Sequence, residues 1–82
     1  MKILWDEPKR QANLAKHGFD FGALTIDFFE AARIELTRDQ RFMAIGRLEE
    51  VAVIAVIFRP LGAEAISIIS MRRASTAERS RL

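Results

Sequence analysis

An uninterrupted apolar run, Val51–Phe58, constrains the fold more than any other part of the sequence. Successive side chains of a strand point to opposite faces, and in this run both sets are apolar and rich in β-branched residues. Such a run is typical of a central strand that is buried on both faces of its sheet. The rest of the chain must therefore supply neighbouring strands and a cover for each face, unless a partner covers one of them.

Other segments have the composition of strands that could flank this run. Ile34 and Leu36 alternate with polar residues, which predicts a half-exposed strand. Pro60 and Gly62 are predicted to end the central strand. Consecutive strands with short turns imply an antiparallel meander, so we expect a four-stranded antiparallel sheet. Its strands are predicted at residues 33–37, 42–47, 51–58 and 65–71, and residues 2–5 are a further strand candidate.

The first third of the chain carries the signals of two helices. Asp6 can cap a first helix that ends at Gly18, because glycine readily adopts the left-handed conformation after a helix. Asp20 can cap a second helix. The apolar face of that second helix comprises Phe21, Leu24 and Phe28.

The end of the chain carries a third helix signal. Residues 75–78 form a capping-box pattern, Ser-Thr-Ala-Glu, which opens a short helix. We therefore expect an α+β fold within one domain of residues 1–82. Two N-terminal helices would pack on the four-stranded antiparallel sheet, and a short C-terminal helix would follow it.

Composition excludes several classes of protein. The 82 residues contain no cysteine and one histidine, which excludes disulfides and thiolate metal sites. No metal or other cofactor is expected. Charged residues follow Met1 too soon for a secretory signal peptide, and the apolar run is too short for a membrane helix. We expect a cytoplasmic protein.

The basic residues are unevenly distributed, although the net charge is only +2. Residues 71–82 carry four arginines and a single glutamate. A guanidinium group can bind phosphate through two parallel hydrogen bonds and can stack on bases, whereas an ammonium group acts as a point charge. This terminus therefore suits RNA or an acidic protein as partner, and a solvated tail is the alternative.

Three groups of residues, which span nearly the whole chain, form a recognisable ordered set. They are Leu4–Glu7, Lys9, Asn13, Lys16–Phe19, Phe21 and Ala23, then Arg41–Phe42 and Ile45–Gly46, then Ile68–Ser70, Arg72–Ala74, Thr76 and Glu78–Arg79. Together they resemble the BrnT family of toxins. Two positions depart from the pattern of that family: Ser67 stands in place of a basic residue and Leu82 in place of a tyrosine.

The resemblance implies a RelE-like fold and an endoribonuclease that inhibits translation by cutting RNA. It also implies a type II toxin–antitoxin system, in which a BrnA-like antitoxin with a ribbon-helix-helix DNA-binding part neutralises the toxin. Two toxin chains could then be joined through the antitoxin or through the apolar face of the sheet.

A second function is compatible with the same resemblance. A catalytically degenerate module of this fold would dock the antitoxin and aid autoregulation of the operon without cutting RNA. Ser67, Leu82 and the short final helix favour this alternative. The retained pairs Arg72–Arg73 and Glu78–Arg79 favour the enzyme.

Cleavage of RNA without a metal ion uses the neighbouring 2′-hydroxyl as nucleophile and needs a base, an acid and positive charge beside the phosphate. Arg72 is the first candidate for that charge, and Arg59 at the end of the neighbouring strand and Arg47 across the sheet could complete a cationic cleft. Strand alternation points Arg72 and Arg73 to opposite faces. Only one of them would therefore reach a bound phosphate, unless the strand ends at Met71.

His17 and Glu78 are the candidates for proton transfer, because histidine titrates near neutrality and a carboxylate can accept a proton. The alternatives are structural. His17 would favour the negative end of the helix dipole, and Glu78 would complete a capping box with Ser75. The remaining candidates for RNA binding are Lys16, Arg47, Arg73, Arg79 and Trp5, although a tryptophan belongs more often to the core than to a stacking platform.

Overall fold

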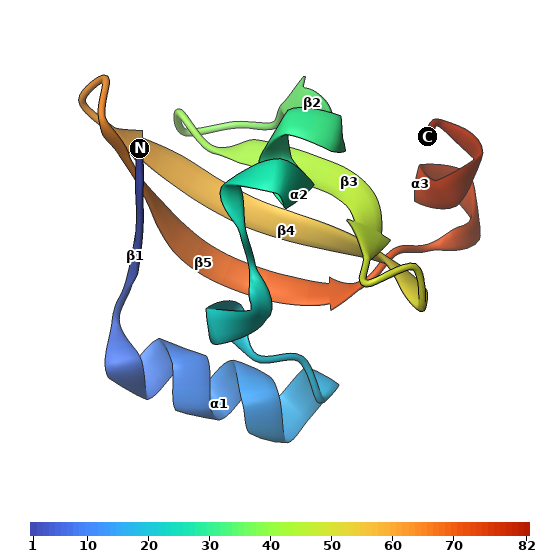
Figure 1. Ribbon diagram of the computed structural model, residues 1–82, viewed down its shortest axis with the longest axis horizontal. Coiled ribbons are helices and arrows are strands. Elements are labelled where there is room, and N and C mark those ends of the chain that lie inside the picture. The colour runs from blue at the N-terminus through green and yellow to red at the C-terminus, as the bar shows by residue number, and fades with distance from the viewer.

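Five strands form one twisted sheet in the computed structural model, which describes residues 1–82 (Figure 1). The spatial order is β1-β5-β4-β3-β2, with β1 parallel to β5 and every other neighbouring pair antiparallel. The strands are β1 (Lys2–Trp5), β2 (Arg33–Leu36), β3 (Phe42–Leu48), β4 (Ala52–Leu61) and β5 (Ala65–Arg73).

The α+β class is confirmed, but the prediction of a four-stranded antiparallel sheet is wrong. The meander of β2 to β5 exists as expected, and β1 adds a fifth strand along the outer edge of β5. Its register sets Trp5 opposite Ile68, so Ile3 and Trp5 add apolar surface to the core. A parallel strand from the chain start cannot be inferred from hairpin-like spacing, because its partner lies far along the sequence.

β4 is the central strand that the apolar run predicts, with Ile54, Ala55 and Val56 fully buried. The expectation that Pro60 ends this strand is wrong, since Pro60 pairs with Ile66 of β5. The pairing of β3 with β4 stops at Phe58, so Pro60 has a neighbouring strand on one side only. Proline is tolerated at such an edge position, where the missing N–H breaks no ladder.

The first predicted helix is α1 (Glu7–His17), which ends at Gly18 in the left-handed conformation. The prediction of a second helix from Asp20 is wrong. Its residues form a 3₁₀ turn, η1 (Phe21–Ala23), and a separate short helix, α2 (Ile26–Ala31).

Two side-chain caps divide that segment. Asp20 accepts a hydrogen bond from the backbone N–H of Gly22 at 2.8 Å, and Thr25 accepts one from the N–H of Phe28 at 3.1 Å. Leu24 is extended between them, with ψ at 139°. Aspartate and threonine compete with helical hydrogen bonds in this way, and Gly22 has low helix propensity.

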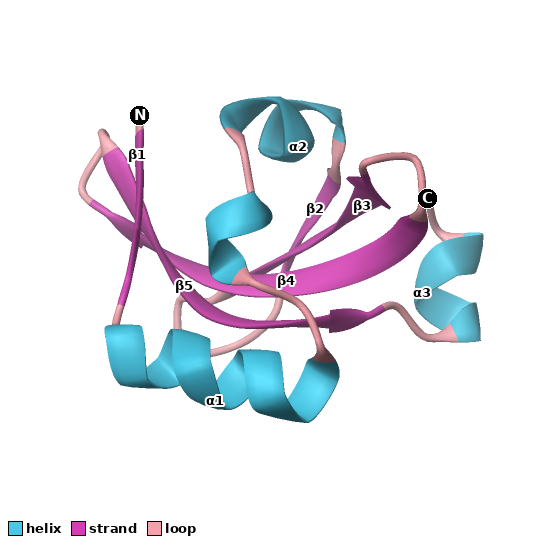
Figure 2. Ribbon diagram, turned by 60° about the horizontal axis from the view of Figure 1, so that its bottom comes forward, coloured by secondary structure: helices cyan, strands magenta, loops and turns pink.

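The apolar residues of this region are nevertheless buried as expected. They face the helix side of the sheet, where α2 and η1 lie against β3, β4 and β5 (Figure 2). The main core comprises Phe21, Leu24, Phe28, Ala44, Ile54, Val56, Phe58, Ile66, Ile68 and Met71.

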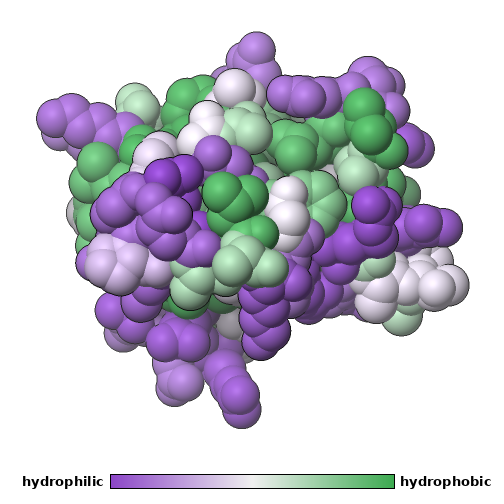
Figure 3. All heavy atoms as spheres, turned by 90° about the horizontal axis from the view of Figure 1, so that it is seen from below, coloured by the Kyte–Doolittle hydropathy of each residue, from purple (hydrophilic) through white to green (hydrophobic).

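A buried asparagine joins α1 to the sheet. The side chain of Asn13 donates to the carbonyl of Met71 at 2.9 Å and accepts from its N–H at 3.0 Å. β1 pairs with β5 only as far as Ile68, so Asn13 satisfies backbone groups of β5 where the neighbouring strand has ended. Seen from below, the molecule carries mainly hydrophilic side chains in the lower half of the view, whereas hydrophobic side chains are exposed among them in the upper half (Figure 3).

The chain ends in α3 (Thr76–Ser80), the predicted short helix. The segment before it crosses to the face of the sheet opposite α2, where Ala74 packs on Met43, Ile45 and Ala55. The second apolar face of β4 is therefore covered partly by the chain itself. None of the helices has the length and apolar composition that crossing a membrane requires.

Candidate functional site

The face of the sheet opposite α2 carries three of the candidate arginines, Arg47, Arg59 and Arg72, and we call it the second face. Its side chains follow from the strand register, because residues paired across neighbouring strands point to the same side. Arginines outnumber carboxylates on this face, which makes it a cationic surface with an apolar floor. The second face comprises Arg33, Glu35, Met43, Ile45, Arg47, Val53, Ala55, Ile57, Arg59, Ser67, Ser70 and Arg72.

Arg72 and Glu78 form a bidentate ion pair at the end of this face. The two guanidinium nitrogens of Arg72 lie 2.7 Å and 2.9 Å from the carboxylate oxygens of Glu78. The Arg72 side chain is 38% exposed and that of Glu78 is 12% exposed. One side of the guanidinium is therefore held by the protein while the group remains accessible to a ligand.

The capping box expected as the structural alternative for Glu78 is confirmed. The carboxylate accepts from the Ser75 N–H at 2.9 Å, and the Ser75 hydroxyl accepts from the Glu78 N–H at 3.1 Å. The Arg72 guanidinium, assisted by the hydrogen bonds from Ser75, lowers the pKa of Glu78 to about 2. A carboxylate with so low a pKa holds protons weakly, which makes it a poor general base near neutrality.

Arg73 lies on the other side of β5, as strand alternation predicts. Arg72 is paired with Ala55 and Arg73 with Ile54, so the strand does not end at Met71 and the two arginines point to opposite faces. The Arg73 guanidinium carbon lies 5.8 Å from the centre of the Phe19 ring, a cation–π contact.

The structure brings three of the predicted RNA-binding arginines together. Arg47, Arg73 and Arg79 line a hollow of about 510 Å³, which we call the arginine hollow. None of the three forms an ion pair, and no acidic side chain lines the hollow. Its other lining residues are Val51, Ala52, Val53 and Leu82.

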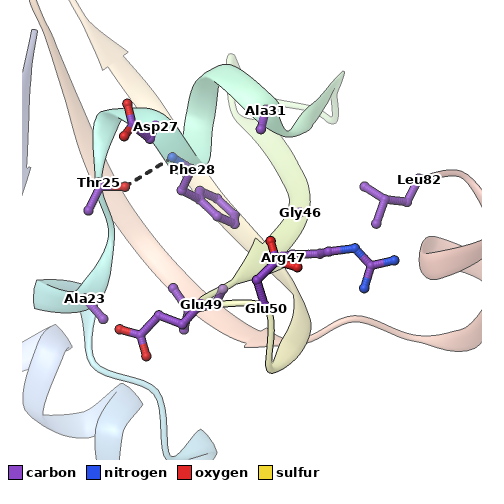
Figure 4. A pocket seen from close by; sticks show the side chains of 11 residues that line it. Ala23, Thr25, Asp27, Phe28, Ala31, Gly46, Arg47, Glu49, Glu50 and Leu82 are labelled. Atoms are coloured by element: carbon purple, nitrogen blue, oxygen red, sulfur yellow. Dashed lines mark hydrogen bonds between the residues drawn. The ribbon is translucent and has the colours of Figure 1, made fainter.

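A second hollow of about 500 Å³ adjoins the first and has the opposite charge (Figure 4). Asp27, Glu49 and Glu50 contribute three carboxylates to this acidic hollow, against one arginine. Arg47 and Leu82 line both hollows, and Figure 4 shows Arg47 reaching toward Leu82. Phosphate is repelled by the acidic hollow and attracted by the arginine hollow, so only the latter suits RNA.

Arg59 lies apart from Arg72. It follows Ala55, the partner of Arg72, by four residues along β4, which corresponds to about 13 Å. The sequence-based expectation of one cleft around both arginines therefore describes two places on one face rather than a single cluster. Ser67 is the direct cross-strand partner of Arg59.

The candidates on α1 and β1 lie around the edge of the sheet. His17 is half-buried and lies one helical turn beyond Asn13, on the side of α1 that meets β5. Lys16 is exposed. Trp5 packs edge-to-face on Phe21, with ring centres 6.4 Å apart, so its ring contacts the core.

Sequence reasoning missed several cations of the second face and the contact that fixes α3. Arg81 donates to Glu35 at 2.8 Å and 3.1 Å, which ties the C-terminal residues to β2. Lys9 and Arg41 lie beside Arg59. The place of Arg41 beside Arg59 follows from the strand register, and it could be predicted only if the pairing of β3 with β4 were known.

The structure offers no evident metal site. No three His, Cys, Asp or Glu side chains are placed to hold a metal ion.

Comparison with known proteins identifies a family and a solved structure that is highly similar to this chain. Residues 5–78 match the family described as the ribonuclease toxin BrnT of type II toxin–antitoxin systems. The crystal structure of the Brucella abortus ribonuclease toxin BrnT is 56% identical in sequence, with a TM-score of 0.89, and the match covers 93% of this chain and 99% of that one. Among curated proteins, no sequence matches significantly.

Proposed function

The chain belongs to the BrnT family of ribonuclease toxins of type II toxin–antitoxin systems, and from this premise we propose that it is an endoribonuclease that inhibits translation by cutting RNA. The observation that carries the proposal is the accessible guanidinium of Arg72, oriented by Glu78 on a cationic sheet face. Residues 1–82 act as one toxin domain in this proposal, and they act in the cytoplasm, where translation takes place.

Arg72 stabilises the charge that develops on the phosphate. As the 2′-hydroxyl attacks the adjacent phosphorus, negative charge accumulates on the non-bridging oxygens, and a fixed guanidinium is a strong donor to them. The bond from phosphorus to the 5′-oxygen then breaks and leaves a 2′,3′-cyclic phosphate. This chemistry needs no metal ion, because the arginine supplies the positive charge.

Glu78 acts in this mechanism through Arg72. Its bidentate contact fixes the plane of the guanidinium, and its low pKa keeps it ionised during the reaction. Pre-orientation of this kind reduces the reorganisation that the reaction would otherwise require. Glu78 is thus a positioning residue, and His17 is the candidate for the proton transfers.

The remaining cations bind the RNA on either side of the cleaved bond. Arg47, Arg73 and Arg79 of the arginine hollow hold phosphate groups, with Lys16 contributing charge from α1. A BrnA-like antitoxin with a ribbon-helix-helix part is the partner that neutralises the toxin, and it does so by covering this cationic surface.

The first experiment measures RNA cleavage by the purified chain in the presence of EDTA. Fragments that end in a 2′,3′-cyclic phosphate and begin with a 5′-hydroxyl are expected. Arg72→Ala should lower kcat/KM by about 10²–10³-fold, and Arg72→Lys should recover only part of that loss because the ammonium lacks the planar fork. Arg38→Ala is the matched control, since Arg38 lies in an exposed turn.

A catalytically degenerate binding module is the second candidate, and one observation favours it. Glu78 neutralises Arg72 and is itself a weak base, so no strong base contacts the central arginine. Folded parent protein that neither cuts RNA nor arrests growth when induced without an antitoxin would establish this alternative. Growth arrest that Arg72→Ala relieves at equal expression would exclude it.

A further inference from the structure

A small hollow on the second face gathers three cations that have no partner. Lys9 of α1, Arg41 before β3 and Arg59 of β4 line it together with Ser67, Leu61 and Ile69. Its volume is about 110 Å³, and no carboxylate lines it. None of the three cations forms an ion pair, whereas Arg10, Arg33, Arg72 and Arg81 all do.

The strand register explains why these groups meet. Phe42 is paired with Phe58, so Arg41 falls beside Arg59, and Arg59 is paired with Ser67 on its other side. This row crosses three neighbouring strands on one face. Lys9 lies one helical turn before Asn13, whose side chain fixes α1 to β5, and it therefore closes the end of the row.

A β-bulge shapes the floor of the hollow. Ile57 is paired with Ser70 and Phe58 with Ile68, which leaves Ile69 as the extra residue of β5. Bulges redirect side chains and are frequent beside functional sites. Here the extra residue lines the hollow and allows Ser67 to stay opposite Arg59.

Three unpaired cations around one small hollow repel each other, and a bound anion would relieve that repulsion. A tetrahedral phosphate can accept from two guanidinium groups, an ammonium and a hydroxyl that approach from different directions. The hollow shares its sheet face with Arg72, about 13 Å away along β4. This distance is too long for one phosphate to contact both places, but a short RNA backbone can span it.

We propose that the hollow of Lys9, Arg41, Arg59 and Ser67 is a second phosphate subsite, which holds a backbone phosphate of the RNA away from the cleaved bond. The inference rests on the proposed function, because it assumes that RNA lies along the second face. It makes Lys9 and Arg41 RNA-binding residues and assigns Arg59 to substrate positioning rather than to the reacting phosphate.

The test compares the binding of two RNAs that cannot be cut, a 2′-O-methyl dinucleotide and a 2′-O-methyl hexanucleotide. The variant is Lys9→Ala/Arg41→Ala, in which both changes are at exposed positions, and Arg38→Ala is the control from the turn that precedes Arg41. The double variant should bind the hexanucleotide about tenfold more weakly and the dinucleotide as the parent does. Its slope of log affinity against log salt for the hexanucleotide should fall by about 0.7, the value for one lost phosphate contact on a single strand.

Each other outcome has a definite meaning. Equal hexanucleotide binding by the double variant and Arg38→Ala would overturn the subsite while the proposed function stands. If the double variant binds both RNAs more weakly by the same factor, the two cations act only through long-range electrostatic attraction, and this outcome would also overturn the subsite. Hexaglutamate serves as an acidic-peptide probe in the same assay. A double variant that loses hexaglutamate binding but keeps RNA binding would overturn the subsite and assign the hollow to an acidic protein segment. A parent that binds neither RNA would overturn the proposed function together with the subsite.

Discussion

The two helices at opposite ends of the chain are attached to the sheet by different kinds of interaction. α1 is held by a buried, neutral amide, since Asn13 makes two hydrogen bonds to the backbone of Met71. α3 has no buried residue and is held by two ion pairs, Arg72–Glu78 and Arg81–Glu35. One attachment depends on hydrogen bonds that water cannot reach, and the other depends on charge.

The attachment of α1 contributes mainly to the stability of the fold, whereas the attachment of α3 involves the residues of the candidate site. Buried backbone groups that lose their partner cost the full desolvation free energy, so α1 is part of the folded state wherever the sheet exists. Ion pairs near the surface contribute little and weaken with acid and salt. Because α3 is attached mainly by these ion pairs, it can be disturbed without loss of the sheet. The same Arg72–Glu78 pair orients the exposed guanidinium of Arg72, so a disturbance of α3 also affects the candidate site.

The largest effect is expected from Asn13→Ala. This change leaves the N–H and carbonyl of Met71 buried without partners, which should lower the free energy of unfolding by about 2–4 kcal/mol. In a domain of this size such a loss lowers Tm by roughly 10–25 °C. Gln11→Ala removes an amide from the exposed side of the same helix and should change Tm by only a few degrees. Equal Tm values for the two variants would contradict the anchoring role of Asn13.

Acid should loosen α3. The pKa of Glu78 is about 2 in the folded protein against an ordinary value of 4.5, so its ion pair stabilises the fold above pH 4.5. That contribution is lost progressively as the pH falls from 4.5 toward 2. Amide protection factors, which correct for the slower intrinsic exchange in acid, should fall in α3 before they fall at Met71. Glu7 and Asp20 also have lowered pKa values, so they add to the acid sensitivity of the whole protein.

Glu78→Gln should have a smaller effect on stability and a selective effect on activity. Glutamine can still complete the capping box with Ser75, so α3 should remain and the free energy of unfolding should fall by only about 1 kcal/mol. Arg72 loses its charged partner and is held less firmly. We expect kcat to fall about tenfold with KM nearly unchanged. A loss of 10³-fold or more in kcat would instead identify Glu78 as the general base.

The smallest effect is expected from Arg81→Ala. The pair with Glu35 lies at the surface and is partly exposed, and such pairs contribute about 0.2–1 kcal/mol at low salt. The Tm difference from the parent should disappear as salt is raised to 1 M, where screening is strong. A salt-independent difference would show that α3 is held by packing rather than by charge.

Local signals in the sequence predict the parts of this molecule whose partners lie nearby. The apolar run of β4, the Gly18 stop of α1 and the Ser75–Glu78 capping box all depend on residues within a few positions of each other. The division of the second helix was missed because two weak local caps, Asp20 and Thr25, outweigh the apolar spacing of the segment.

The missed features of the candidate site are all non-local. Asn13 and Met71 are 58 positions apart, and Arg81 and Glu35 are 46 positions apart. Arginine chemistry makes Arg72 and the three arginines of the arginine hollow candidates from the sequence alone, but the hollow that brings those three together follows only from the structure. The separation of Arg59 from Arg72, and the presence of Lys9 beside Arg59, follow only from the register of the sheet and the place of α1.

The position of β5 has a consequence for how the chain folds during its synthesis on the ribosome. This strand follows the other four in the sequence, yet it lies between β1 and β4 and supplies the backbone that Asn13 binds. β1 and α1 therefore have no docking surface until β5 has been made, and non-local closure of this kind is slow. Arg72 lies on the same strand, so we expect a nascent chain to carry no assembled site before β5 has left the ribosome.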